Sequence, residues 1–482
     1  MTVTLDSLAD FTLATLRRVA WQGEAVEIGP QAEALMRRRR SEFLAFVERS
    51  PDTPIYGVTS GFGDRAAVML TPEERERQAT MPPLLQAAGV GRPLPDRVVR
   101  AMILGRLINF VSGYAAVSLE TAQGVAALLD GRPLPPVRIA GQDSPGELLQ
   151  LFNLFHPFMG ETSRLRDQNA LRNGAACAPG LAGDLALRAR RRALLASTVF
   201  ALSIDAANMG LAPYDPALKP LLRDPYEATA IDRLQALLAG CSAAGRREYQ
   251  APISWRVLTR MLGQLFRVVD EVEGAAIELL STVNDNPVFL GPEEAPPLGR
   301  CITTGGFHVP RAYHAMNWQA QLWADLAPVA ARQVEQLHRH AVTGLPERLW
   351  VGEKRFSTAF LGMTANDLAA RAQAAARPAL IPLYGGNDGQ TDTAMPLFLA
   401  FEREGETARW LDLILAILAA SASQALTVAG REPAPPLRPF LASVQQRFPP
   451  VESARDLGAD VERLADAFDG WVLETGEELG IV

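Results

Sequence analysis

Stretches of helical periodicity constrain the fold of this chain more than any other feature of its sequence. Within them apolar residues recur three or four positions apart, which is the spacing of one face of an amphipathic helix. The longer stretches cover residues 185–208, 256–280, 310–340, 364–376 and 402–429. Sustained alternation of apolar and polar residues, which a half-buried strand would require, is not seen in the sequence. The pattern therefore predicts an all-α protein built around a central bundle of very long helices.

The length of the chain predicts more than one structural region. At 482 residues it exceeds what one compact core usually holds, so two or more subregions sharing an extended core are expected. Shorter helical patterns come first, over residues 5–19, 31–48 and 96–117. We predict an N-terminal domain over residues 1–200, and a long-helix bundle domain with the C-terminal helices over residues 201–482.

Charge and apolar content exclude several classes of protein. The formal net charge of −7 and the hydrophobic content of 48% are typical of a globular chain, and an acidic balance gives no electrostatic basis for binding nucleic acid. The most apolar run, residues 413–429, contains four polar side chains and is bordered by Asp412 and Arg431. We therefore expect a buried bundle helix there and no membrane span.

Cysteine and histidine usage indicates a reducing compartment and no metal site. Cys177, Cys241 and Cys301 lie far apart and have neither disulfide nor metal-binding spacing. His338 and His340 are two residues apart on a predicted helix, so they face different sides of it and make a poor metal pair. Because residues 1–11 do not read as a signal segment, we expect a cytoplasmic protein with free thiols.

A glycine-rich loop is the first candidate for a functional site. Residues 56–63 read Tyr-Gly-Val-Thr-Ser-Gly-Phe-Gly, and three glycines in eight residues imply unusual backbone angles or close approach of other groups. A tyrosine held in such a loop can present its hydroxyl to a pocket. Tyr56 is therefore a candidate for moving a proton, although an ordinary turn with a packed aromatic ring is the alternative.

A second loop, residues 138–151, feeds a helix. Ser144 or Asp143 can cap this helix, Pro145 suits its first position, and Glu147 would lie in its first turn. The start of a helix points backbone N–H groups at whatever lies before it. The loop is therefore either a well-capped helix start or part of a site.

Several motifs, in order along the chain, resemble those of the histidine and phenylalanine/tyrosine ammonia-lyases and the related aminomutases. The loop at 56–63 is similar to their Tyr-Gly-x-x-Thr-Gly-Phe-Gly motif, and residues 85–89, Leu-Gln-Ala-Ala-Gly, to their substrate-selecting segment. Further similar motifs lie at residues 106–114, 173–174, 250–256, 284–287, 305–308 and 389–392. Together they span most of the chain, which makes the resemblance specific. It implies the histidine ammonia-lyase-like fold and a homotetramer with sites shared between subunits.

The resemblance also implies an electrophilic group that this chain lacks the residues to make. In the family, a methylidene-imidazolone forms from an Ala-Ser-Gly tripeptide; ring closure needs a β-hydroxyl on the middle residue and a backbone N–H on the third. Here the tripeptide falls on Ser144-Pro145-Gly146, where Pro145 has no hydroxyl, or on Asp143-Ser144-Pro145, where the proline has no N–H. We therefore predict a degenerate loop from Asp143 to Gly146 and no prosthetic group.

The remaining predicted site residues form a binding set with one base. The resemblance implies Tyr56 as the proton carrier and Arg256 as the holder of a substrate carboxylate through two parallel hydrogen bonds. The rest of the set is Asn173, Gln250 and Gln390 for hydrogen bonds, Leu85 and Phe307 around an apolar ring, and Gln86 at the substrate-selecting position. Ile253 and Thr391 stand where the family has tyrosine and glutamate. Plain structural roles, such as a surface ion pair for Arg256 or core packing for Phe307, are the alternative interpretations.

Two classes of function remain, and we favour an enzyme. A positioned general base contributes about 10² to 10⁴ in rate, whereas enzymes reach roughly 10⁶ or more, so Tyr56 alone cannot replace the electrophile on a plain amino acid. We expect a carbon–nitrogen or carbon–oxygen lyase of ammonia-lyase ancestry, of the kind used in secondary metabolism. It would carry out elimination, addition or isomerisation on a small, anionic aromatic or acyl substrate. The alternatives are a non-catalytic binding or scaffold homologue and an ordinary aromatic amino acid ammonia-lyase.

Overall fold

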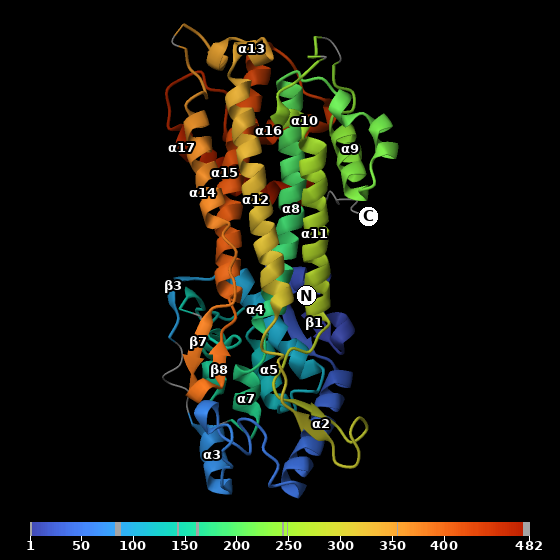
Figure 1. Cartoon of the computed structure of the whole chain (residues 1–482), viewed down its shortest axis with the longest axis vertical. Helices are drawn as coiled ribbons and strands as arrows, with labels where there is room; N and C mark the ends of the chain where they lie inside the picture. The colour runs from blue at the N-terminus through green and yellow to red at the C-terminus, as the bar shows by residue number, and fades with distance from the viewer. Residues whose placement is uncertain are drawn as a thin grey trace. The chain divides into compact units, whose positions relative to one another are not determined.

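The computed structural model describes residues 2–81, 88–141, 144–160, 163–242, 245–247, 249–353 and 355–475 (Figure 1). Its longest elements are four helices of 23 to 33 residues, whereas each described strand has only three or four. The described strands pair only in twos, as β1–β2, β3–β4, β5–β6 and β7–β8. The prediction of an all-α fold with very long helices is confirmed.

The elements of the first half are β1 (Thr2–Leu5), α1 (Leu13–Leu16), β2 (Ala25–Ile28), α2 (Pro30–Arg49), α3 (Pro72–Thr80), β3 (Val90–Pro93), α4 (Asp96–Val111), α5 (Leu119–Ala127), β4 (Arg138–Ala140), α6 (Leu148–Phe155), α7 (Asp167–Arg172), α8 (Cys177–Ala206) and α9 (Pro225–Leu237). Those of the second half are α10 (Ile253–Arg256), α11 (Leu258–Leu280), β5 (Val288–Leu290), β6 (Arg300–Ile302), α12 (Pro310–Leu337), α13 (His340–Thr343), α14 (Leu361–Ala375), β7 (Leu383–Gly386), β8 (Thr391–Thr393), α15 (Leu397–Ala429), α16 (Arg438–Arg447) and α17 (Leu457–Thr475). The predicted long helices agree with α8, α11, α12, α14 and α15 to within a few residues, except at the start of α8, which begins eight residues earlier than predicted.

The chain divides into two compact units, and neither is continuous in sequence. Unit 1 contains Met1–Leu187, Val272–Met316 and Ala379–Glu402, and unit 2 contains Arg188–Glu271, Asn317–Pro378 and Arg403–Val482. Helices α8, α11, α12 and α15 each contribute residues to both units. The predicted domain boundary at residue 200 stays a prediction, because these units are defined by packing and not by one cut in the sequence.

The predicted helix over residues 5–19 is only partly correct. β1 pairs with β2 in parallel, with Thr2 opposite Ala25 and Leu5 opposite Ile28. Alternate residues of both strands are buried, but over four residues this alternation is too short to distinguish from the helical pattern that follows it. The helical part begins later, with α1.

In unit 1, α4 and the start of α8 approach each other closely. A β-carbon at Gly105 of α4 would lie 2.1 Å from the carbonyl oxygen of Ala176, and one at Gly180 of α8 would lie 2.4 Å from the backbone of Ala101. Glycine is therefore required at both positions by space, since both residues are helical. This close packing buries α4 from Val98 to Val111.

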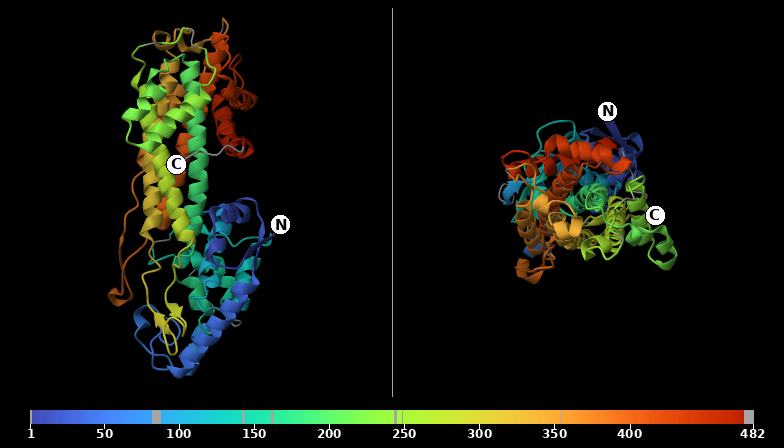
Figure 2. Two further views of the ribbon diagram at one scale, coloured as in Figure 1. Left: turned by 90° about the vertical axis from the view of Figure 1, so that its right-hand side faces the viewer. Right: turned by 90° about the horizontal axis from the view of Figure 1, so that it is seen from above.

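In unit 2, the long helices lie side by side (Figures 1 and 2). Arg192 of α8 donates two hydrogen bonds of 2.7 Å to the carboxylate of Asp412 in α15. The buried carboxylate of Glu404 accepts from Trp323 Nε1 of α12 at 2.9 Å and from Arg188 at 2.9 Å. Removing one partner of such a buried pair is costly, so these contacts fix how the helices align along one another.

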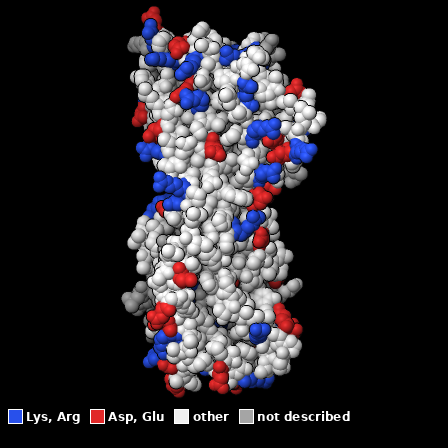
Figure 3. Space-filling model, viewed as in Figure 1, with Lys and Arg blue, Asp and Glu red and all other residues white. Residues whose placement is uncertain are grey.

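α15 is the one described helix long and apolar enough to cross a membrane, and 83% of its most apolar window is buried inside the protein. The core helix of a soluble protein passes the same test. The burial agrees with the prediction of a bundle helix at residues 413–429. On the face drawn in Figure 3, side chains of both charges are interspersed.

The helix start predicted around Ser144 and Pro145 is wrong. α6 begins at Leu148, and Glu147 stands at the capping position without a side-chain capping bond. Its carboxylate accepts hydrogen bonds from the backbone N–H groups of Cys177 and, at 2.7 Å, Ala178, at the start of α8. A contact distant in sequence thus determines the conformation here, and local capping rules do not include such contacts.

Candidate active site

The Tyr56 loop is held rigidly on both sides of the tyrosine. Ile55 and Val58 belong to a buried cluster with phenylalanines of α2 and β5. Inside the loop, the Thr59 hydroxyl donates to the Thr53 carbonyl at 2.6 Å and accepts from the Ile55 N–H at 2.7 Å. The half-buried Tyr56 ring is therefore attached to a fixed backbone.

The unusual backbone predicted from the glycines of this loop is confirmed. Gly57 has φ +72°, and a β-carbon on it would lie 2.1 Å from the ring of Phe62. Phe62 packs edge to face against Tyr56, with ring centroids 5.6 Å apart. The Tyr56 hydroxyl accepts a hydrogen bond from the Gly63 N–H at 3.3 Å, its one hydrogen bond with the described residues. Its O–H donor is therefore left for a ligand or for a proton transfer.

Arg172, the last residue of α7, lies next to this tyrosine and is absent from the predicted site. Its guanidinium carbon is 3.4 Å from the centroid of the Phe62 ring, and the phenol of Tyr56 is near enough to influence it electrostatically. Burial lowers the pKa of Arg172 to about 10. The signal in the sequence was the position of Arg172 directly before Asn173 and Gly174, which the resemblance had singled out.

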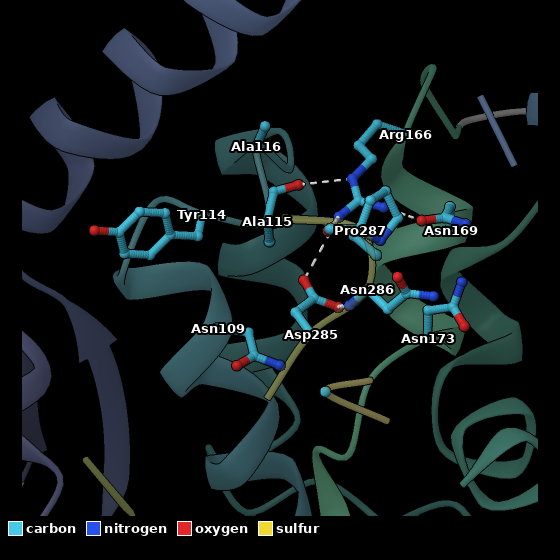
Figure 4. Close-up of polar contacts among 12 residues, drawn as sticks. Asn109, Tyr114, Ala115, Ala116, Arg166, Asn169, Asn173, Asp285, Asn286 and Pro287 are labelled. Carbon is cyan, nitrogen blue, oxygen red and sulfur yellow. Dashed lines mark hydrogen bonds and ion pairs between the residues drawn. The ribbon is translucent and has the colours of Figure 1, made fainter. Parts of the chain in front are cut away.

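A polar scaffold holds the start of α7 against the loop that follows α11 (Figure 4). Arg166 donates to the carbonyls of Ala115 at 2.9 Å and Pro287 at 2.6 Å, and lies 3.6 Å from the carboxylate of Asp285. Burial raises the pKa of Asp285, an effect that the nearby Arg166 opposes. This scaffold gives α7 a fixed position within unit 1.

Asn169 and Asn173 extend the scaffold to the Tyr56 loop. The side-chain amide of Asn169 donates to the Tyr56 carbonyl at 3.2 Å. The Asn173 backbone N–H donates to the Asn169 carbonyl at 3.0 Å, and its own carbonyl accepts from Arg106 at 2.6 Å. Within the described part of the chain the Asn173 amide side chain makes no hydrogen bond, so it remains a candidate for ligand binding.

Gly146, in the loop that holds Pro145, lies close to Phe307 and to the turn after Asn173. Gly146 has φ +70°, and a β-carbon on it would lie 3.0 Å from Phe307 and 3.7 Å from the Gly174 carbonyl oxygen. The Ser144 carbonyl accepts from the Met395 N–H at 3.2 Å. Phe307 and Gly174, the residue after Asn173, thus lie against the loop that holds Pro145.

The residues of this loop do not fit the chemistry that builds a methylidene-imidazolone. Pro145 carries no hydroxyl that could leave as water, and in the other register it offers no N–H for ring closure. The Ser144 hydroxyl lies 3.5 Å from the Gly146 carbonyl oxygen. Within the described ranges, no group of three or more His, Cys, Asp or Glu side chains is placed to hold a metal ion.

The Gln390 segment also approaches the Tyr56 loop. A β-carbon at Gly63 would lie 2.6 Å from Asn387 Oδ1, so the turn at Asn387–Gly389 contacts the glycine that binds the Tyr56 hydroxyl. The Gln390 N–H donates to the Asn387 carbonyl at 3.0 Å, and the Gln390 side chain is exposed. Tyr56 and Gln390 therefore belong to neighbouring segments of unit 1.

Arg256 and Gln250 form a separate pair in unit 2. Arg256 donates to the side-chain oxygen of Gln250, and both line a 190 Å³ surface pocket with Arg247 and Tyr249. Ile253, at the start of the same short helix, is 69% exposed. The structure thus brings Arg256 and Gln250 together with each other but assigns them to a different unit from Tyr56.

Three predicted residues, Leu85, Gln86 and Asp143, lie outside the described residues.

Glu147, which is not among the predicted site residues, is buried beside the loop that holds Pro145. Burial raises its pKa to about 7, and the two N–H groups that it binds, together with Arg106, oppose the rise. The same burial, with Glu147 nearby, raises the pKa of the Cys177 thiol.

Comparisons with known proteins identify the relatives of this chain. The family model described as aromatic amino acid lyase matches residues 11–169 and 162–446. The chain is 26% identical to a histidine ammonia-lyase of Symbiobacterium thermophilum over 492 aligned residues, covering 95% of each chain. It is 27% identical to a histidine ammonia-lyase of Anaeromyxobacter dehalogenans, covering 96% of this chain and 98% of the other.

Solved structures show the same fold. The tyrosine aminomutase of Streptomyces globisporus superimposes with a TM-score of 0.86 at 22% identity, covering 98% of each chain. The ergothionase of Treponema denticola gives 0.85 at 17% identity, covering 98% of this chain and all of the other. With the family model matching most of its length, this chain belongs to the aromatic amino acid lyase family.

Proposed function

We propose that this protein is a lyase-like enzyme of ammonia-lyase ancestry that works without a methylidene-imidazolone group. Its substrate would be a small, anionic aromatic or acyl compound, and its reaction an elimination, addition or isomerisation. The observation that supports this proposal most is the position of the Tyr56 hydroxyl. It lies in a rigid loop, and its one hydrogen bond within the described residues is accepted from the Gly63 N–H. A phenol in such a position can exchange a proton with a bound substrate.

The elimination needs one base and a leaving group. The deprotonated Tyr56 oxygen takes an acidic proton from one substrate carbon. The electron pair of the broken C–H bond forms the double bond, and the leaving group departs from the neighbouring carbon with its bonding pair. Addition is the reverse, and isomerisation returns the proton to another carbon. Because a base alone contributes about 10² to 10⁴ in rate, the substrate must bring an acidic proton or a leaving group better than ammonia.

Arg256 is the proposed partner for an anionic group, acting from a neighbouring subunit of a homotetramer. Large apolar side chains exposed on helices support the assembly, among them Ile253 (69%), Ile277 (53%), Trp318 (52%) and Met363 (73%). If Arg256 holds a carboxylate, Arg256→Lys keeps the charge, loses the planar pair of donors and weakens binding by about 1.5 to 3 kcal/mol. A ligand indifferent to this change would refute the carboxylate role.

A non-catalytic scaffold is the second candidate, favoured by Ile253 and Thr391 in place of a tyrosine and a glutamate of the family. The names of the relatives suggest a third candidate function, which is ordinary histidine or aromatic amino acid ammonia-lyase activity. One assay series separates the three. We expect phenylalanine, tyrosine and histidine to give no cinnamate, coumarate or urocanate, and an aryl or acyl hydroxy acid to be turned over. Turnover of one of the amino acids supports the third candidate, and no turnover in any assay supports the scaffold.

A further inference from the structure

Arg172 differs from the other arginines of its surroundings in having no counter-group. Arg166, six residues earlier, donates to two carbonyls and lies 3.6 Å from the carboxylate of Asp285. Arg172 makes no hydrogen bond or ion pair with any residue in the described ranges, and its Nη2 is buried. Its guanidinium contacts only aromatic faces, those of Phe62 at 3.4 Å and Phe152 at 5.9 Å.

This lack of a counter-group is unusual because a guanidinium carries five N–H donors and a fixed charge. Arg172 is half-buried, and leaving its buried Nη2 without a partner is unfavourable for the free protein. Burial lowers the pKa of Arg172 to about 10, and it still remains protonated at neutral pH. The site is therefore built around a positive charge that the described part of the chain does not neutralise.

We propose that Arg172 binds the carboxylate of the ligand in addition to Arg256, against the Phe62 ring and beside the Tyr56 hydroxyl. The inference rests on the proposed function, since it names the chemistry that the same site recognises. A guanidinium lying flat on a ring leaves its edge free for two parallel hydrogen bonds to a planar carboxylate. A single cation between apolar rings suits a monoanion with an aromatic or acyl body better than doubly charged phosphate.

The position of Arg172 also bears on the reaction. A carboxylate held there places its neighbouring C–H bonds near the Tyr56 oxygen. When a proton leaves such a carbon, negative charge spreads onto the carboxylate, and a fixed cation stabilises that charge. Arg172 is therefore both an anchor and a determinant of specificity for acids over their neutral analogues.

Calorimetric titration of the full-length protein with cinnamate, its neutral amide and inorganic phosphate tests the inference. We expect cinnamate to bind at least tenfold more tightly than the amide, and phosphate not to compete with it. Arg172→Met should weaken cinnamate binding by roughly 10- to 100-fold, the range for hydrogen bonds to a charged group, and leave binding of the amide unchanged. The cinnamate affinity of Arg172→Lys should lie between those of the natural protein and Arg172→Met.

Arg37→Met, an exposed arginine on α2, is the matched control and should leave cinnamate binding unchanged. The melting temperature of Arg172→Met should be equal to or above that of the natural protein, because a half-buried charge without a counter-group is removed. Absence of cinnamate binding, equal binding of acid and amide, competition by phosphate, or an unchanged affinity in Arg172→Met would each overturn the inference.

Two further variants separate this inference from the proposed function. Tyr56→Phe should leave cinnamate affinity within about twofold, since the hydroxyl is not the charged partner. If turnover proves insensitive to Tyr56→Phe while Arg172→Met still loses cinnamate, the proposed function fails and the binding inference stands. If Arg256→Lys weakens cinnamate binding and Arg172→Met does not, the binding inference fails and the proposed function stands.

Discussion

The carboxylate of Glu147 accepts a hydrogen bond from the backbone N–H of Cys177, at the first residue of α8. The free N–H groups and the dipole of a helix start favour a negative charge. Burial acts in the opposite direction and is the larger effect, so the pKa of Glu147 rises from 4.5 to about 7. The loop that holds Pro145 is thus attached to α8 through a group that titrates near neutrality.

Glu147 should therefore make stability fall as pH rises. Between about pH 4.5 and pH 7 the folded protein holds a proton on Glu147 that the unfolded chain has lost, so deprotonation disfavours the folded state. Compared with Glu147→Gln, which cannot titrate, the natural protein should lose up to about 3 kcal/mol of unfolding free energy between pH 5 and pH 8. Urea unfolding of both proteins measures this. A natural protein that instead gains stability relative to Glu147→Gln as pH rises would show that the N–H donors outweigh burial.

The close approach of α4 and α8 predicts a severe effect of one methyl group. At Gly180 a β-carbon would lie 2.4 Å from the Ala101 backbone, whereas at Gly274 of α11 it would meet nothing within 4 Å. Gly180→Ala should lower the free energy of unfolding by about 1 to 3 kcal/mol or more through overpacking. Gly274→Ala should raise it by about 0.5 to 1 kcal/mol, because alanine favours a helix. Equal effects of the two changes in denaturant unfolding would contradict this packing.

Tyr56→Phe is expected to affect catalysis and not folding. The hydroxyl makes one hydrogen bond, from the Gly63 N–H, within the described residues, so its removal should change stability by about 1 kcal/mol or less. Turnover of an accepted substrate should fall by about 10²-fold or more. Tyr226→Phe, which removes a hydroxyl bound to Asp270 in unit 2, is the control and should retain turnover. Steady-state kinetics of the natural protein and the two variants measure this. Full activity in Tyr56→Phe would show that another residue is the base.

The assembly is expected to be a homotetramer. The exposed apolar side chains on α10, α11, α12 and α14 need a covering surface that a second copy of the chain can supply. Light scattering at micromolar concentration should give four times the chain mass of 52.1 kDa. A monomer mass under these conditions would contradict the prediction and the sharing of sites between subunits.

The sequence predicts the helices well because their periodicity is a local property repeated over many residues. The prediction is weaker where a single residue determines the end of a helix. The helix expected over residues 96–117 ends at Val111, because Gly113 adopts φ +79° and terminates it. The Tyr56 loop could be identified because its glycines are adjacent in sequence. Such features need no knowledge of the rest of the chain.

The environment of Arg172 could not be predicted in the same way. Its burial comes from Phe62 and Phe152, which are far from it in sequence, and its lack of a counter-group is a property of the assembled unit. The carboxylate of Glu147 likewise finds its partners at Cys177 and Ala178, thirty residues away. Residues whose role depends on such distant contacts require the structure.

The intact mass of the purified protein, with peptide mapping across residues 138–151, shows whether the loop that holds Pro145 carries a methylidene-imidazolone. Formation of a methylidene-imidazolone removes two water molecules from three consecutive residues. Pro145 lacks the hydroxyl needed at the middle position and the N–H needed at the third position, so neither alignment of the tripeptide can react. We expect the mass of the unmodified sequence, with Ser144, Pro145 and Gly146 intact in the mapped peptide. A loss of two waters located at these residues would contradict it.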